Sequence, residues 1–189
     1  MPTPYRSEAV GEPPLMLALS TFFAVRDAVS ASAGHKVPVD LVAPATPERI
    51  LLAASDGKGF VANASEVVAE TRKGRQVVNV RTGAKLAVAR TIPAGHDYAA
   101  VVGDNRKLVV FPLEELPEMT RGQGVTLQKY RDGGLSDATS FRFDEGLSWA
   151  MGGETGRIRT EADLTLWRVA RGAAGRMPPT GFPRDNRFG

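Results

Sequence analysis

The chain repeats one pattern at a spacing of about fifty residues: Leu51-Leu52-Ala53-Ala54-Ser55-Asp56-Gly57-Lys58-Gly59-Phe60-Val61 recurs as Ala99-Ala100-Val101-Val102-Gly103-Asp104-Asn105-Arg106-Lys107-Leu108-Val109. A shift of 48 residues aligns the two copies without a gap, placing Asp56 on Asp104 and Lys58 on Arg106. A weaker third copy follows at a shift of 50, which aligns Arg121-Gly122 with Arg171-Gly172. Recurrence at this spacing indicates units that pack on their neighbours.

Each copy has the pattern of a β-hairpin followed by further short strands. An apolar run rich in Val and Leu meets a turn of Gly, Asp or Asn, and a second apolar run follows. Hairpins are expected at 51–63, 99–111 and 147–160, further strands at 77–80, 87–89 and 125–127, and helical turns at 65–70 and 113–118. Four short strands per unit are typical of a propeller blade. We therefore predict an all-β array of about three blades, over 49–96, 97–146 and 147–176, which is an incomplete ring.

The two ends of the chain differ from the repeats. Residues 1–48 are predicted to be a leader, with a truncated first blade as the alternative. The apolar run Leu15 to Val25 follows Glu12-Pro13-Pro14 instead of a basic region, and it is shorter than the roughly 20 residues that span a bilayer. A buried strand or helix is therefore expected there. Residues 177–189, with Pro178, Pro179 and Pro183, predict an extended tail.

The amino-acid composition limits the functions that this chain can have. The 189 residues include no cysteine, which excludes disulfides and thiolate catalysis and favours the cytosol. Lys and Arg number 24 against 21 Asp and Glu, for a net charge of +3. The basic residues gather at turns and the acidic ones between them, as in Glu114-Glu115 and Glu118. A basic rim is therefore compatible with a small net charge.

No catalytic centre, cofactor or metal site is predicted. His35 and His96 are the only histidines, and neither has a nucleophile or a second ligand at motif spacing. The cluster Gly152-Gly153-Glu154-Thr155-Gly156-Arg157 lacks the spacing and the Lys-Ser/Thr of a phosphate loop, so a hairpin turn is expected. Trp149 and Trp167 are expected to pack in the core. For Tyr130, edge packing and stacking on a nucleic acid remain open.

The basic glycine corners carry the functional signal. Glycine beside Arg or Lys lets backbone N–H groups and a cation converge on one anion. The corner Arg72-Lys73-Gly74-Arg75 recurs as Arg121-Gly122-Gln123-Gly124 and as Arg171-Gly172. Equivalent corners of successive blades point to one rim, and a bent duplex is a polyanion that follows such a curve.

Four segments stand out as a set: Leu51 to Val78, 103–117, Arg121-Gly122-Gln123-Gly124-Val125 and Pro178-Pro179-Thr180-Gly181-Phe182-Pro183-Arg184. Together they resemble the C-terminal domain of the A subunit of bacterial DNA topoisomerase IV, of which gyrase A is a relative. The resemblance covers about residues 49–189 and implies a β-pinwheel whose basic outer rim binds and bends DNA. By position, the implied DNA-binding residues are Lys58, Arg72, Lys73, Arg75, Arg106, Lys107, Arg121, Lys129, Arg131, Arg171 and Arg176.

The resemblance also implies partners and a location. The expected partners are double-stranded DNA, the breakage-reunion domain of the A subunit, and the ATPase B subunit, in a bacterial cytoplasm at the nucleoid, with no membrane. The glutamine-arginine-arginine-glycine-glycine box of gyrase A is absent, which favours the topoisomerase IV type. No catalytic tyrosine context surrounds Tyr5, Tyr98 or Tyr130, so the chain is not expected to cut DNA. The alternative is a propeller-like protein-interaction module without DNA binding.

Overall fold

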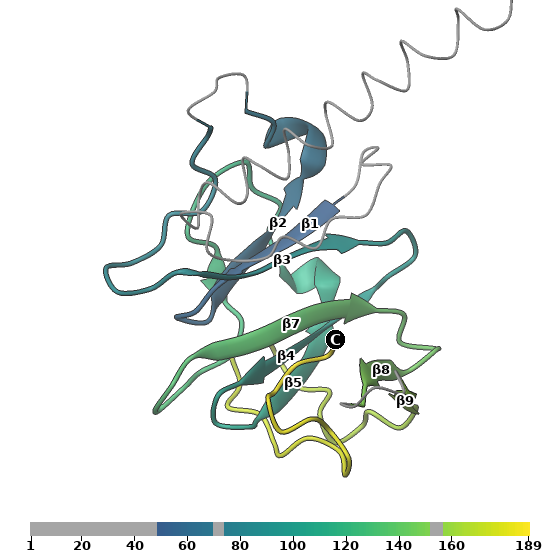
Figure 1. Cartoon of the computed structure of the whole chain (residues 1–189). Helices are drawn as coiled ribbons and strands as arrows, with labels where there is room; N and C mark the ends of the chain where they lie inside the picture. Colours follow the sequence, from purple (N-terminus) through teal and green to yellow (C-terminus); the bar gives the residue numbers. More distant parts are fainter. Residues whose placement is uncertain (1–48, 70–73, 152–156) are drawn as a thin grey trace, which may run out of the picture.

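The computed structural model describes residues 49–69, 74–151 and 157–189. They form small antiparallel sheets, which confirms the predicted all-β class (Figure 1). The first sheet has the order β3-β1-β2-β6, the second β5-β4-β7, and a hairpin of β8 and β9 follows. The strands are β1 (Arg49–Ala54), β2 (Lys58–Asn63), β3 (Leu86–Ile92), β4 (Tyr98–Gly103), β5 (Leu108–Pro112), β6 (Val125–Thr126), β7 (Leu135–Phe141), β8 (Leu147–Ala150) and β9 (Ile158–Glu161).

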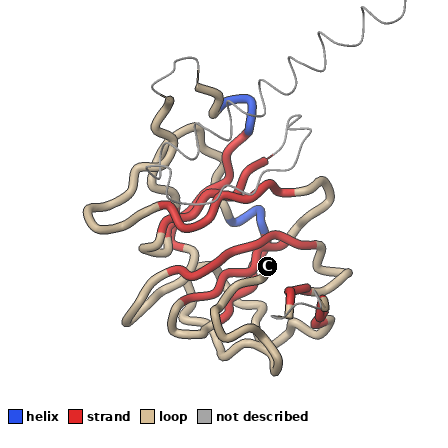
Figure 2. Tube along the Cα trace, viewed as in Figure 1, coloured by secondary structure: helices blue, strands red, loops and turns tan. Residues whose placement is uncertain are grey.

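The two short helical turns are shorter than predicted. The 3₁₀ turns η1 (Ala64–Glu66) and η2 (Leu113–Glu115) follow β2 and β5 directly. In η1 the Asn63 side chain accepts a hydrogen bond from the Ser65 backbone N–H, which starts the turn. Loops make up much of the rest of the described chain (Figure 2).

The structure corrects the alignment of the repeat. The segment β1-β2-η1-β3 recurs as β4-β5-η2-β7 with β1, η1 and β3 displaced by 49 residues, not 48. Arg106 therefore occupies the place of Gly57, and both residues have a positive φ, of 57° and 81°. A register shift also falls at the same place in both copies, between Ala53 and Ala54 and between Val102 and Gly103. The last strand of the second copy, β7, was not among the predicted strands.

Strands β1, β2, β4 and β5 are mostly apolar because the first two sheets are covered on both faces. One core cluster lies between the first two sheets and includes Leu51 and Val61 on one side and Val101 and Phe111 on the other. A second joins β4 and β5 to Leu147, Trp149 and the C-terminal tail. Trp149 is 1% exposed, so its predicted place in the core is confirmed. Trp167 is half-buried against the same cluster, and its Nε1 donates to the carbonyl of Met177 at 2.7 Å.

Each of the first two sheets is completed by a segment from the following repeat. Strand β6, which comes after the second hairpin, pairs with Lys58 and Gly59 at the outer edge of β2. In the same way Arg176 bonds to Leu108 at the outer edge of β5, through two backbone hydrogen bonds of 2.7 and 3.1 Å. This backbone pairing links successive repeats.

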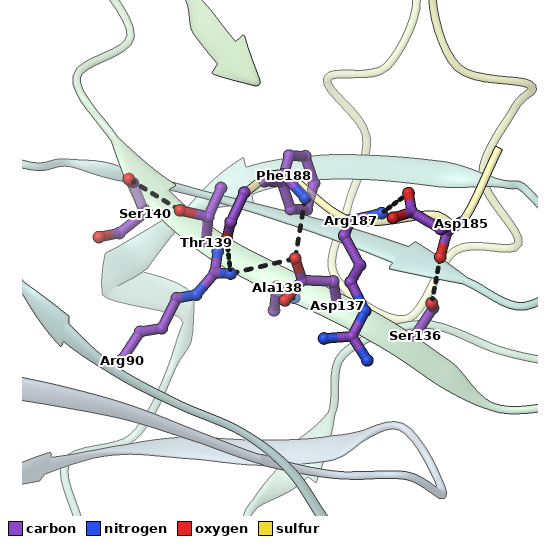
Figure 3. Close-up of polar contacts among 10 residues, drawn as sticks. Arg90, Ser136, Asp137, Ala138, Thr139, Ser140, Asp185, Arg187 and Phe188 are labelled. Carbon is purple, nitrogen blue, oxygen red and sulfur yellow. Dashed lines mark hydrogen bonds and ion pairs between the residues drawn. The ribbon is translucent and has the colours of Figure 1, made fainter. Parts of the chain in front are cut away.

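The tail after residue 176 contains no regular helix or strand, yet it packs on the domain. Phe182, Asn186 and Phe188 are buried, and the Phe182 ring lies 5.4 Å from that of Trp149. The last residues run beside β7, where polar contacts link them to the sheet (Figure 3). The leader 1–48 and the glycine cluster 152–156 lie outside the described residues.

Candidate nucleic-acid interface

The two hairpin turns lie next to each other at one edge of the molecule. The Leu135 N–H donates to the carbonyl of Ser55 in the first turn at 2.9 Å. Gly134 exchanges hydrogen bonds with Asp104 in the second turn, through its carbonyl at 2.9 Å and its N–H at 3.0 Å. The segment 127–135 thus connects the two turns. We call residues 55–58, 104–107 and 127–135 the turn edge.

Tyr130 lies inside the turn edge rather than on its surface. The positions where a Cβ would stand on Gly57 and on Gly103 are each 2.4 Å from a ring carbon of Tyr130. Burial, with a smaller contribution from the Asp104 carboxylate, raises the pKa of the Tyr130 phenol. Its hydroxyl is buried without a hydrogen-bond partner among the described residues. Of the two alternatives for this residue, the structure therefore supports packing.

Five of the predicted DNA-binding residues lie in the turn edge: Lys58, Arg106, Lys107, Lys129 and Arg131. Lys58 and Lys107 end the two turns at equivalent positions and are half-buried. Lys129 and Arg131, on either side of Tyr130, are exposed. The Lys129 backbone N–H donates to the carbonyl of Ala173 at 3.2 Å, which brings the third repeat to the same edge.

Two further cations at this edge were not predicted. The Lys85 carbonyl accepts from the Ser55 N–H at 2.8 Å, and the Lys85 N–H donates to the Ser55 hydroxyl at 3.1 Å. The Arg81 guanidinium lies 3.9 Å from the Asp56 carboxylate. Both are exposed and both flank Gly83, at the turn that precedes β3. The signal was present in the sequence as another basic glycine turn, Arg81-Thr82-Gly83-Ala84-Lys85.

Arg121 lies in the segment that precedes β6, and Arg176 lies at the outer edge of β5. Arg121 is exposed, and its Nε donates to the Asn79 side chain at 3.5 Å. Two residues further on, the Gln123 side chain accepts from the Lys58 ammonium at 3.4 Å. Arg176 is exposed beside Leu108, the residue that follows Lys107.

The side chain of Arg106, within the turn edge, and the predicted residues outside it are placed differently. The Arg106 guanidinium donates to the carbonyls of Pro183 and Phe182 at 3.1 and 3.4 Å. Arg171 is half-buried and donates to the carbonyl of Thr126 at 2.7 Å. Arg75 donates to the carbonyl of Glu66 in η1, at the opposite end of β2 from the turn. Arg72 and Lys73 lie outside the described residues.

The opposite ends of the strands carry acidic residues. Glu66, Glu114 and Glu115 follow β2 and β5 in the 3₁₀ turns and are exposed. The loops at this end add Asp144 and Glu145, which pair with Arg142 at 3.1 and 3.2 Å. The domain therefore has a basic edge at the hairpin turns and an acidic edge at the other end of the same strands.

The acidic edge also contains the one described histidine. His96 Nδ1 lies 2.9 Å from the hydroxyl of Ser140, and burial lowers the pKa of the ring. Across residues 49–69, 74–151 and 157–189, no three His, Asp or Glu side chains gather in a group that could hold a metal ion. Within the same ranges no helix is long and apolar enough to cross a membrane.

Comparisons with known proteins agree with this geometry. Residues 48–93 and 97–135 match the family model described as DNA gyrase C-terminal domain, beta-propeller. The A subunit of DNA topoisomerase 4 from Rickettsia bellii is 44% identical over 139 residues, which are 74% of this chain and 18% of that protein. That of Caulobacter vibrioides is 43% identical over 138 residues, 73% of this chain and 18% of that protein. The chain thus spans about a fifth of the length of these relatives.

A solved structure has the same fold. The C-terminal domain of ParC from E. coli superposes with a TM-score of 0.60 at 20% identity, covering 72% of this chain and 58% of that one. The shared outer strands and the paired turns define a propeller-like repeat protein with Lys58, Lys107, Lys129 and Arg131 at one edge. The chain belongs to the family of C-terminal β-pinwheel domains found in gyrase A and in the A subunit of topoisomerase IV.

A shorter stretch of the chain is similar to an unrelated enzyme. The xanthine dehydrogenase of Blastobotrys adeninivorans is 48% identical over 59 residues, which are 29% of this chain and 4% of that protein. So small a share of that enzyme supports no oxidoreductase activity in this chain.

Proposed function

We propose that this domain binds and bends duplex DNA through phosphate contacts at the turn edge, as an accessory domain of a type IIA topoisomerase of the topoisomerase IV type. The supporting observation is the junction of the two turns, where hydrogen bonds through Ser55, Asp104 and Gly134 bring cations of successive repeats to one edge. The DNA-contacting cations are Lys58, Lys107, Lys129, Arg131, Arg121 and Arg176, with Arg81 and Lys85 as additions.

The charge distribution fixes the orientation of the DNA. Phosphates are attracted to the turn edge and repelled by Glu66, Glu114 and Glu115 at the opposite edge. Since these contacts read phosphates and no base edges, the binding is largely independent of sequence.

The domain works with other parts of the enzyme. A segment bound at the turn edge would be presented to the breakage-reunion domain of the A subunit, with the ATPase B subunit supplying the energy of strand passage, at the bacterial nucleoid in the cytoplasm. The chain's own residues hold and curve the DNA, and the cutting chemistry belongs to the partner domain.

Salt-dependent binding tests the proposal. The wild-type chain should be retained on a duplex at about 50 mM salt, and log K should fall by about 0.9 per phosphate contact as log salt rises. The double variant Lys129→Gln, Arg131→Gln should reduce that slope by about 1.8. Its matched control is Arg142→Gln, Arg168→Gln, which removes the same charge but lies toward the acidic edge, where Arg142 pairs with Asp144 and Arg168 covers the Tyr98 ring. The control should keep the wild-type slope.

Two results would end the proposal. One is a folded wild-type chain that does not bind duplex at about 50 mM salt, which would leave the protein-interaction module as the function. The other is an equal loss of slope in both double variants, since a diffuse charge effect would then explain the binding.

A further inference from the structure

The Tyr130 ring is the only described side chain that contacts the Cβ positions of both Gly57 and Gly103 closely. Distances from the two Cβ positions to ring carbons are 2.4 Å each, to Cε2 on the Gly57 side and Cε1 on the Gly103 side. Any larger residue at either position would collide with the ring. The two turns therefore approach each other only as closely as the thickness and orientation of this ring allow.

The backbone around Tyr130 is held on both sides. Leu127 donates to the carbonyl of Gly57 at 2.8 Å before the ring, and Leu135 donates to Ser55 at 2.9 Å after it. The segment thus has fixed anchors on the first turn, while Gly134 is bonded to the second. With its backbone held in this way, the ring has little freedom to leave the space between the turns.

The buried hydroxyl contributes nothing visible to this arrangement. It has no hydrogen-bond partner among the described residues, although an unpaired buried hydroxyl is costly. The ring, and not the phenol group, is therefore what the geometry requires.

We infer that Tyr130 is a positioning residue that fixes the spacing of the two hairpin turns of successive repeats, and so sets the curvature of the DNA that the turn edge accepts. This inference rests on the proposed function. Lys58 and Lys107, one on each turn, would meet phosphates at a spacing that the ring determines. A duplex of matching curvature then binds without the energy of bending, and a straight one must first be bent.

Two variants disturb the spacing in different ways. Tyr130→Ala removes the ring and frees the turns, whereas Gly103→Ala keeps the ring but places a methyl group 2.4 Å from it. Gly103 has no positive φ, so backbone strain does not complicate the change, as it would at Gly57 with a φ of 81°. Tyr130→Phe is the matched control, because it keeps the ring and removes the unpaired hydroxyl.

The readout is the preference for curved DNA. For each variant, affinity is measured for a minicircle of about 100 base pairs and for a linear duplex of the same sequence, because bending cost distinguishes the two. We expect the wild type and Tyr130→Phe to prefer the minicircle, and the preference to fall about tenfold in Tyr130→Ala and Gly103→Ala. Linear binding and its salt slope should stay unchanged, since every cation is retained.

The possible results distinguish a failure of the role inferred for Tyr130 from a failure of the proposed DNA binding. A wild-type chain that binds both DNAs equally overturns the role of Tyr130 but leaves DNA binding standing, whereas one that binds neither ends the proposed function itself. Equal losses on minicircle and linear duplex would assign Tyr130 a general structural role and overturn the inference. Near-ultraviolet circular dichroism checks that each variant is folded, and Gly103→Ala carries the test if Tyr130→Ala does not fold.

Discussion

The Asp137 carboxylate of β7 lies 3.2 Å from the Arg90 guanidinium of β3, so an ion pair joins the first and second sheets. The same carboxylate accepts from the Phe188 backbone N–H at 2.9 Å, and Arg90 also donates to the carbonyl of Gly189 at 2.6 Å (Figure 3). At the equivalent position of the first repeat stands Val88, which is buried. A buried charge therefore replaces an apolar residue at the point where the tail meets two sheets.

Stability should depend on the protonation of Asp137. Burial raises the pKa of this carboxyl above its usual 3.8, more than Arg90 and the backbone N–H groups of Phe188 and Ala138 lower it. Between 3.8 and the raised pKa the folded state holds more protons than the unfolded state, so this group's contribution to stability is lost as pH rises. Asp137→Asn removes that dependence. The unfolding free energy of the variant minus that of the wild type should therefore increase as pH rises through this window.

Urea unfolding of both proteins from about pH 3 to pH 8 measures the difference. The slope contributed by one group cannot exceed about 1.4 kcal/mol per pH unit. A difference that shifts toward the wild type with rising pH would mean that the ion pair with Arg90 outweighs burial.

Arg106 is expected to act on stability more than on DNA. Its guanidinium binds two tail carbonyls, at 3.1 and 3.4 Å, with a fork geometry that a lysine ammonium cannot reproduce. Arg106→Lys keeps the charge, so it should lower the unfolding free energy by about 1 to 3 kcal/mol while leaving the salt slope of DNA binding near wild type. Thermal and urea unfolding measure the first effect and fluorescence anisotropy the second. A stable variant with a reduced slope would instead place Arg106 on the DNA.

The hairpins could be predicted because they depend on local sequence. The exact register could not, since matching residue types placed Asp56 on Asp104, whereas the backbone places Gly57 on Arg106. Strand β7 was missed because Asp137 and Ser140 are polar yet buried. The hydrogen bond from Arg106 to the Pro183 carbonyl could not be predicted either, because the two residues are 77 positions apart in the chain.

The tail should be integral to the fold although it contains no regular structure. Phe182 is buried against Trp149 and Phe188, so Phe182→Ala should cost about 3 to 5 kcal/mol. Met177, which is 60% exposed, is the control, and Met177→Ala should change stability by less than about 0.5 kcal/mol. In a Trp167→Phe background, Trp149 emission should shift to longer wavelength in Phe182→Ala. Unchanged stability and emission would show that the tail is dispensable.

The pairing of β6 with β2 of the preceding repeat depends on a close backbone contact at Gly124. A Cβ on this residue would stand 2.1 Å from the carbonyl oxygen of Gly59, and its φ is 73°. Gly83 has a similar φ of 84° but nothing within 4 Å of its Cβ position. Gly83→Ala should therefore show only the cost of a left-handed backbone, about 1 to 2 kcal/mol. Gly124→Ala should cost more, because β6 must also move away from β2. Urea unfolding of the two variants measures the difference between their unfolding free energies. Equal costs would mean that β6 can move away from β2 without loss of stability, and that successive repeats are held together by their cores alone.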